Sequence, residues 1–218
     1  MELKGKKIVF LGDSITEAAG LATFDDVYWN VLARNTGAEV YGYGIGGSRI
    51  ARQHTPSADP RMDRWFASRV EEMIPDADII VVFGGTNDFG HGDAAFGRFT
   101  DRTDETFCGA CHDLMVKLIN RYPDAQILFM TPLHRTTEEN DGLNEWGVRR
   151  QGVLEDYVNM IIRVAGHYGI PVLDLFRTCK IQPNVPVLYE KYTVDGLHPN
   201  KAGHELIAHC LQKKLEQL

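Results

Sequence analysis

The chain has 218 residues, enough for one large domain with a substantial buried core. Hydrophobic residues make up 44% and charged residues 24% of the sequence, a balance that excludes a disordered, collagen-like or coiled-coil protein. The formal net charge of −7 disfavours nucleic acid and anionic membrane surfaces as partners.

Apolar runs of strand length alternate with segments in which apolar residues recur every three or four positions. In chain order, the pattern predicts strand 8–11, helix 28–33, strand 40–43, helix 65–74, strand 79–83, helix 107–122, strand 127–130, helix 154–168, strand 172–175 and a last helix at about 202–215. This alternation predicts a single α/β domain over residues 1–218, with a mostly parallel sheet covered by helices on both sides.

Two longer irregular stretches, 89–104 and 133–150, each follow a predicted strand. Ligands of open α/β sheets bind beyond the carboxyl ends of the strands, so these stretches are expected to border a pocket. They contain four candidates for substrate contact, which are Phe89, His91, His134 and Trp146. The aromatic side chains among them either line an acyl pocket or only hold the loops in place.

No apolar run approaches the roughly 20 residues that a membrane-spanning helix needs, which predicts no membrane insertion. The first residues lack the long apolar region and the cleavage site of a secretory signal. Four scattered cysteines are too few for a disulfide scaffold in a chain of this size. We therefore expect a cytoplasmic protein with reduced thiols.

Ser14 follows the first predicted strand, at a position where a serine alone most often caps a helix. Near the other end of the chain, Asp195 and His198 stand three residues apart on a loop that contains Gly196 and Pro199. An acid that orients a histidine, which in turn deprotonates a serine, is the arrangement of a catalytic triad. The alternative for His198 is a solvated loop histidine.

Two glycine-rich segments, 42–47 and 84–88, follow the second and third predicted strands. Backbone N–H groups at glycines can approach a ligand closely, and the amide of Asn87 can donate a hydrogen bond to a developing oxyanion. Each segment taken alone is equally explained by a tight turn.

Together these blocks resemble the SGNH hydrolases, also called GDSL-type esterases and lipases, and they occur in the order of that family. The matching segments are Gly12-Asp13-Ser14-Ile15, with Ile where the family pattern has Leu, the glycine block ending at Gly47, Gly84-Gly85-Thr86-Asn87-Asp88, and Asp195 to His198. The resemblance implies a flavodoxin-like, three-layer α/β/α sandwich with a five-stranded parallel sheet.

The resemblance also implies the roles of these residues. Ser14 is the expected nucleophile, His198 its general base and later acid, and Asp195 the group that orients His198. The expected oxyanion hole consists of the N–H groups of Ser14 and Gly47 and the side-chain amide of Asn87. An Asn that is common in the family is replaced here by Gly42, so Gly46 remains an alternative to Gly47. No metal or cofactor is implied.

The function expected from these features is a serine esterase that cleaves a small-molecule, short-acyl or acetyl ester through an acyl-enzyme. Short acyl groups are favoured because the sequence offers no amphipathic lipid-docking helix or apolar lid. The alternatives are a lysophospholipase or acyl thioester hydrolase and, from another class, a non-catalytic carbohydrate- or nucleotide-binding module. The oligomeric state is left open.

Two further motifs have simpler explanations. Residues 42–47 spell a dinucleotide fingerprint, but Pro56 and Pro60 interrupt the segment where its helix should begin. Residues 108–112 spell a haem-attachment or redox motif, but they lie in the apolar face of a predicted helix. Cysteine there is expected to be a small buried hydrophobe.

Overall fold

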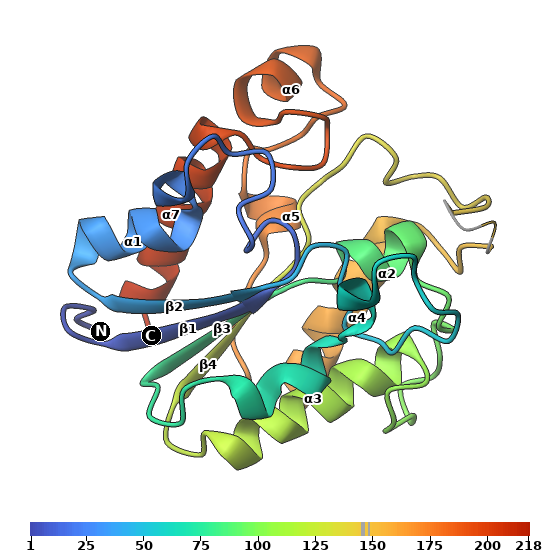
Figure 1. Cartoon of the computed structure of the whole chain (residues 1–218), viewed down its shortest axis with the longest axis horizontal. Helices are drawn as coiled ribbons and strands as arrows, with labels where there is room; N and C mark the ends of the chain where they lie inside the picture. Colours follow the sequence, from blue (N-terminus) through green and yellow to red (C-terminus); the bar gives the residue numbers. More distant parts are fainter. Residues whose placement is uncertain (145–146, 148) are drawn as a thin grey trace.

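The computed structural model describes residues 1–144, 147 and 149–218 (Figure 1). Its parallel five-stranded sheet confirms the predicted fold, with the order β2-β1-β3-β4-β5. The strands are β1 (Lys7–Gly12), β2 (Glu39–Gly44), β3 (Ile79–Phe83), β4 (Gln126–Met130) and β5 (Val172–Leu173). β5 is shorter than predicted because Asp174 caps the next helix, α5 (Leu175–Thr178), by accepting the Arg177 N–H.

Side chains of the central strands alternate between two apolar cores, one on each face of the sheet. Val9, Leu11, Ile80 and Val82 belong to the core shared with α3 (Phe107–Arg121) and α4 (Leu154–His167), whereas Ile8, Phe10, Ile79 and Val81 belong to the core shared with α7 (Lys201–Glu216) and α1 (Tyr28–Thr36). Figure 1 shows the two helix layers on opposite sides of the sheet. The result is the predicted three-layer sandwich.

The helix predicted over 107–122 forms as α3, and its two cysteines are both free and buried. Cys108 and Cys111 pack in the same core as Leu114 and Leu118. Burial raises the pKa of the Cys111 thiol well above its usual value, so this sulfur stays protonated. The motif at 108–112 is therefore part of a core helix.

The helix predicted over 65–74 is instead a 3-10 helix, η3 (Phe66–Glu72). Its inward side carries not only apolar groups but also the buried guanidinium of Arg69, which bonds to the backbone of neighbouring strands. Five short elements of the described chain had no counterpart in the prediction: η1 (Phe24–Asp26), η2 (Pro60–Asp63), α2 (Thr86–His91), α5 and α6 (Pro186–Tyr192). α2 falls partly within the stretch expected to be irregular.

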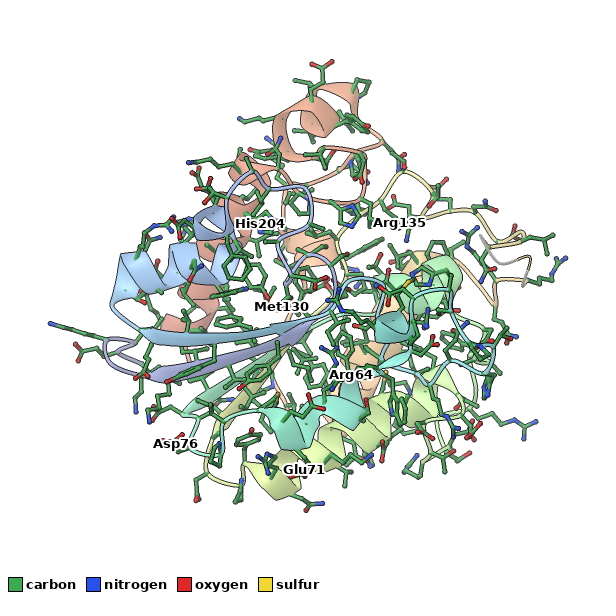
Figure 2. The ribbon with its side chains drawn as sticks, viewed as in Figure 1. Arg64, Glu71, Asp76, Met130, Arg135 and His204 are labelled. Atoms are coloured by element: carbon green, nitrogen blue, oxygen red, sulfur yellow. The ribbon has the colours of Figure 1, made fainter. Side chains whose placement is uncertain are left out.

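The register of the sheet places the carboxyl ends of the strands level with one another. Gly12 of β1 is opposite Gly44 and Phe83, and Phe83 is opposite Met130, which Figure 2 labels at this end of the sheet. The segments that follow these strands consequently meet at one edge. Within the described part of the chain, no helix has the length and apolar character needed to cross a membrane.

Candidate active site

The turn that carries Ser14 begins directly after β1. Gly12 has no room for a side chain, because a Cβ there would collide with Thr16. The Asp13 carboxylate accepts the Ile15 N–H at 3.1 Å, and the Asp13 carbonyl accepts the Glu17 N–H at 2.9 Å. These bonds hold Ser14 in a tight turn at the rim of the sheet.

Ser14, His198 and Asp195 form a hydrogen-bonded series. The Ser14 Oγ lies 3.0 Å from the His198 Nε2, and the His198 Nδ1 lies 2.7 Å from an Asp195 oxygen. A carboxylate can only accept, so Nδ1 carries the proton and Nε2 is free to accept the hydroxyl proton of Ser14. Residues 184 positions apart in the chain are thus in direct contact.

Asp195 is held as a carboxylate by its surroundings. Partial burial favours the neutral acid, but hydrogen bonds from the His198 ring and from the His198 and Leu197 N–H groups lower the pKa of Asp195 below its usual value. The loop needs glycine at 196, where φ is +80° and a Cβ would lie 2.5 Å from the Thr136 side chain. The acid and the imidazole are therefore fixed by one constrained loop.

The glycine block after β2 contains two candidate oxyanion donors, the N–H groups of Gly46 and Gly47, and they differ in their hydrogen bonds. The Gly46 N–H is already bonded, at 2.6 Å, to the carboxylate of Glu17. The N–H groups of Gly47 and Ser14 have no hydrogen-bond acceptor among the described residues. Gly47 has a φ of +73°, and Met62 packs so closely that a Cβ at Gly47 would collide with it. Of the two glycines, Gly47 has the donor available to a ligand.

Asn87 lies at the start of α2, next to the glycine block. One N–H of its side-chain amide donates to the Ser48 carbonyl at 3.0 Å, which leaves the second N–H for a ligand. Asp88 accepts the N–H groups of Ile50 and Ala51 at 3.0 and 2.8 Å, so α2 is bonded to the segment that follows Gly47. The block of Asn87 is thus joined to the glycine block, and the bond between Gly46 and Glu17 joins both to the turn of Ser14.

Two buried acids support these three blocks. Burial raises the pKa of both Asp13 and Asp88 to about 6, against the hydrogen bonds that each accepts from the backbone. Neither carboxyl is bonded to Ser14 or His198, and both bond to backbone N–H groups. This arrangement fits the holding of loops rather than proton transfer.

Arg69 and Glu17 also belong to the site, although neither lies in a recognisable sequence motif. The buried guanidinium of Arg69 donates to the carbonyls of Tyr43 and Gly12 and to the Ser48 hydroxyl, which ties together the ends of β1 and β2. Glu17 bonds to Gly46 and pairs with Arg61. The only feature of the sequence that could have pointed to either residue is that Glu17 lies three residues after Ser14.

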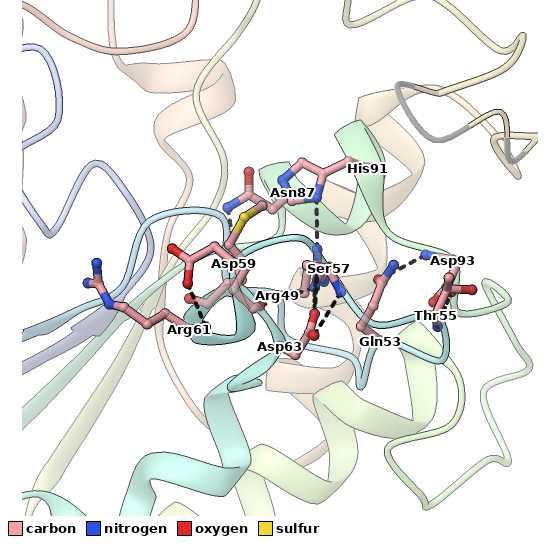
Figure 3. Close-up of polar contacts among 12 residues, drawn as sticks. Arg49, Gln53, Thr55, Ser57, Asp59, Arg61, Asp63, Asn87, His91 and Asp93 are labelled. Atoms are coloured by element: carbon pink, nitrogen blue, oxygen red, sulfur yellow. Dashed lines mark hydrogen bonds and ion pairs between the residues drawn. The ribbon is translucent and has the colours of Figure 1, made fainter.

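The four predicted substrate contacts have different outcomes. Phe89 has no exposed surface and packs against Tyr157 in the core, which contradicts a substrate contact and fits the alternative that the ring holds the loop in place. His134 bonds to Glu138 at 2.8 Å and lies against the ring of Phe176. His91 is bonded to Arg49 and lies beside Asn87 (Figure 3). Trp146 lies outside the described residues.

A hydroxyl, an imidazole and a carboxylate in series, beside unpaired backbone donors, is the arrangement used by serine hydrolases. The chain belongs to the GDSL-like lipase/acylhydrolase family, because the profile of that family matches residues 10–206. A comparison with curated protein sequences finds no significant match.

Solved structures agree with this assignment. A protein of Lactobacillus plantarum is 33% identical, with a TM-score of 0.82 and 98% of each chain covered. An acetyl xylan esterase is 22% identical, with a TM-score of 0.65 and coverage of 96% of this chain and 99% of that one. A lipase/acylhydrolase of Enterococcus faecalis is 20% identical, with a TM-score of 0.64 and coverage of 97% and 96%. The last two share the fold.

Proposed function

We propose that the protein is a serine esterase that hydrolyses small carboxylic esters with acetyl or other short acyl groups through an acyl-enzyme. The observation that carries this proposal is the contact of 3.0 Å between the Ser14 Oγ and the His198 Nε2, with Asp195 behind the ring. Family membership supports the broader class of acylhydrolase.

The reaction follows from the positions of the donors and acceptors. The Ser14 oxygen attacks the ester carbonyl while His198 takes the hydroxyl proton, and the carbonyl oxygen becomes an oxyanion that the N–H groups of Ser14, Gly47 and Asn87 stabilise. His198 then gives the proton to the departing alcohol. Water, deprotonated by the same imidazole, releases the carboxylic acid and restores Ser14.

The preference for short acyl groups rests on the surroundings of the oxyanion donors. Met62 packs directly against Gly47, and Phe89 lies in the core. Met62 therefore fills the space beside Gly47, and Phe89 has no surface that could line an acyl pocket. The four cysteines are all free, which fits a reducing compartment such as the cytoplasm.

A side-by-side assay of purified protein tests the proposal. The substrates are p-nitrophenyl esters from acetate to palmitate, an acetylated sugar, an acyl-CoA and a lysophospholipid, with Ser14→Ala protein as the control for contaminating esterase. We expect kcat/KM to fall beyond about butyrate. A maximum at long acyl chains, or higher activity on the lysophospholipid or the thioester, would select the corresponding alternative. Absence of hydrolysis in the whole series would favour a non-catalytic binding module.

A further inference from the structure

His91 occupies a position next to the oxyanion donors. It follows Asn87 by four residues on α2, so the two side chains project from the same side of the helix. Figure 3 shows the His91 ring beside the Asn87 amide, with its contact to Arg49 on the other side. The residue is only 8% exposed, so nearly all of its ring is enclosed by protein.

Arg49 fixes the tautomer of His91. The Arg49 guanidinium lies 2.8 Å from the His91 Nδ1, and a guanidinium can only donate, so Nδ1 accepts and the ring proton is on Nε2. Arg49 is itself held by Asp63, at 2.8 Å, and by the Ser57 hydroxyl and the Met62 carbonyl, both at 3.1 Å. The imidazole is therefore anchored by a rigid partner.

The ring also remains uncharged. Burial, followed by the charges of Arg49 and Arg135, lowers the pKa of His91 to about 4. At neutral pH the side chain consequently presents one N–H group, at Nε2, and no positive charge of its own.

That N–H has no hydrogen-bond partner among the described residues. The Nε2 atoms of His112 and His204 also have no hydrogen-bond partner, but both atoms are fully buried. The Nε2 atom of His91 is not among the fully buried atoms. A donor that is fixed in direction, reachable from solvent and adjacent to Asn87 is suited to a ligand.

The two sides of the site approach Ser14 from opposite faces of the sheet. Phe89 of α2 packs in the core with Leu11, whereas α7, which follows His198, packs in the core with Phe10. During ester cleavage the carbonyl oxygen occupies the oxyanion hole and the leaving oxygen must face His198. The acyl substituent takes a third direction, different from that of His198, and we infer that the part of α2 beyond Asn87 borders it.

We propose that the Nε2–H of His91 donates a hydrogen bond to an oxygen on the acyl group of the substrate. This inference rests on the proposed esterase function and, among short acyl groups, favours alkoxy-, hydroxy- or oxo-acyl groups over unsubstituted ones of the same length. An unsubstituted alkyl chain at this place would leave the N–H without a partner, which weakens binding in the transition state.

Two esters that differ only by oxygen in place of a methylene test the inference. p-Nitrophenyl methoxyacetate and p-nitrophenyl butyrate have the same leaving group and the same acyl length. The readout is the ratio of their kcat/KM values, and comparison between variants cancels their different intrinsic reactivities. His91→Asn retains an acceptor for Arg49 and removes the donor at Nε2, whereas His91→Gln places an amide N–H near that position.

We expect the methoxyacetate-to-butyrate ratio to fall roughly 3- to 10-fold in His91→Asn and to stay within about two-fold of wild type in His91→Gln. An unchanged ratio, or an equal loss for both esters, would overturn the inference and leave the esterase function intact. If the wild type hydrolyses neither ester, both proposals fail.

A second measurement needs no variant. In wild-type protein labelled with ¹⁵N-histidine, saturating methoxyacetate should shift the Nε2 resonance of His91, and butyrate should not. Equal shifts with the two acids, or none with methoxyacetate, would contradict the assignment.

Discussion

The carboxylate of Glu17 accepts the backbone N–H of Gly46 at 2.6 Å. Glu17 itself lies three residues after Ser14, the proposed nucleophile. A Cβ at Gly46 would lie 3.7 Å from the Ser14 Cβ, so the contact is made beside the reacting hydroxyl. The bond fixes the peptide that joins Ile45 to Gly46 and leaves the next N–H, that of Gly47, for the oxyanion. We therefore expect Glu17 to act as a positioning residue of the proposed oxyanion hole.

Replacing Glu17 by Ala should lower kcat by about ten-fold with KM changed less than two-fold, because the Gly47 N–H loses its fixed direction. This loss is smaller than the roughly 10²- to 10³-fold cost of removing an oxyanion donor outright. Glu17→Gln, whose amide oxygen can still accept from Gly46, should recover most of the rate. Steady-state kinetics on p-nitrophenyl acetate measure both effects.

Arg61→Met is the matched control for Glu17. It removes the ion pair between Arg61 and Glu17 at the surface but leaves the bond to Gly46. Exposed pairs contribute little, so kcat should stay within about two-fold of wild type. Equal losses in Glu17→Ala and Glu17→Gln, or an effect on KM alone, would rule out the positioning role.

Asp195→Asn should lower kcat/KM by about 10³- to 10⁴-fold while the protein remains folded. The introduced amide can donate to the His198 Nδ1, which moves the ring proton to Nε2 and removes the acceptor for the Ser14 hydroxyl. Kinetics at pH 7 to 8 and circular dichroism check the two parts. Retention of more than a tenth of the activity would mean that Asp195 does not set the tautomer.

His204, labelled in Figure 2, should make the protein sensitive to acid. Its Nδ1 accepts the Tyr28 N–H at 3.2 Å, and burial, with a smaller effect of the His198 charge, lowers its pKa to about 4 against the opposing charge of Asp26. Between pH 4 and 6.5 the unfolded chain binds the proton and the folded protein does not. The stabilisation is therefore complete above pH 6.5 and is lost as the pH falls towards 4.

His204→Asn keeps an acceptor for Tyr28 and removes the titrating ring. The difference in free energy of unfolding between wild type and variant should shift by about 2 to 3 kcal/mol in favour of the variant between pH 7 and pH 4. The raised pKa values of Asp13 and Asp88 stabilise the folded protein as the pH falls over this range. Both residues are present in wild type and variant, so their effect cancels in the difference. Urea unfolding at several pH values measures the shift, with His209→Asn on the exposed side of α7 as the control. A constant difference would show that His204 is protonated equally in both states.

The strands β1, β3 and β4 were predictable because each is a short run that is apolar on both faces, as buried parallel strands require. The six residues of α2 were not, since Asp88 and Gly90 interrupt any apolar period. Arg69 gave no signal either, because a buried guanidinium that bonds to backbone carbonyls is indistinguishable in sequence from an exposed one.

The candidate site was predictable where chemistry is tied to a motif. Ser14, Asn87, Asp195 and His198 each lie in a block whose order along the chain is informative, and the sheet topology brings these blocks to one edge. Phe89 was misassigned because the sequence of a loop does not tell whether an aromatic ring turns inward or outward. The direction of a side chain depends on contacts with distant residues.

Labelling with a fluorophosphonate, followed by intact mass measurement and peptide mapping, tests the central claim most directly. The account predicts one covalent adduct, on Ser14, together with loss of p-nitrophenyl acetate hydrolysis, and it predicts neither adduct nor hydrolysis in Ser14→Ala protein. Undiminished hydrolysis by folded Ser14→Ala protein, or an adduct on another residue, would contradict it.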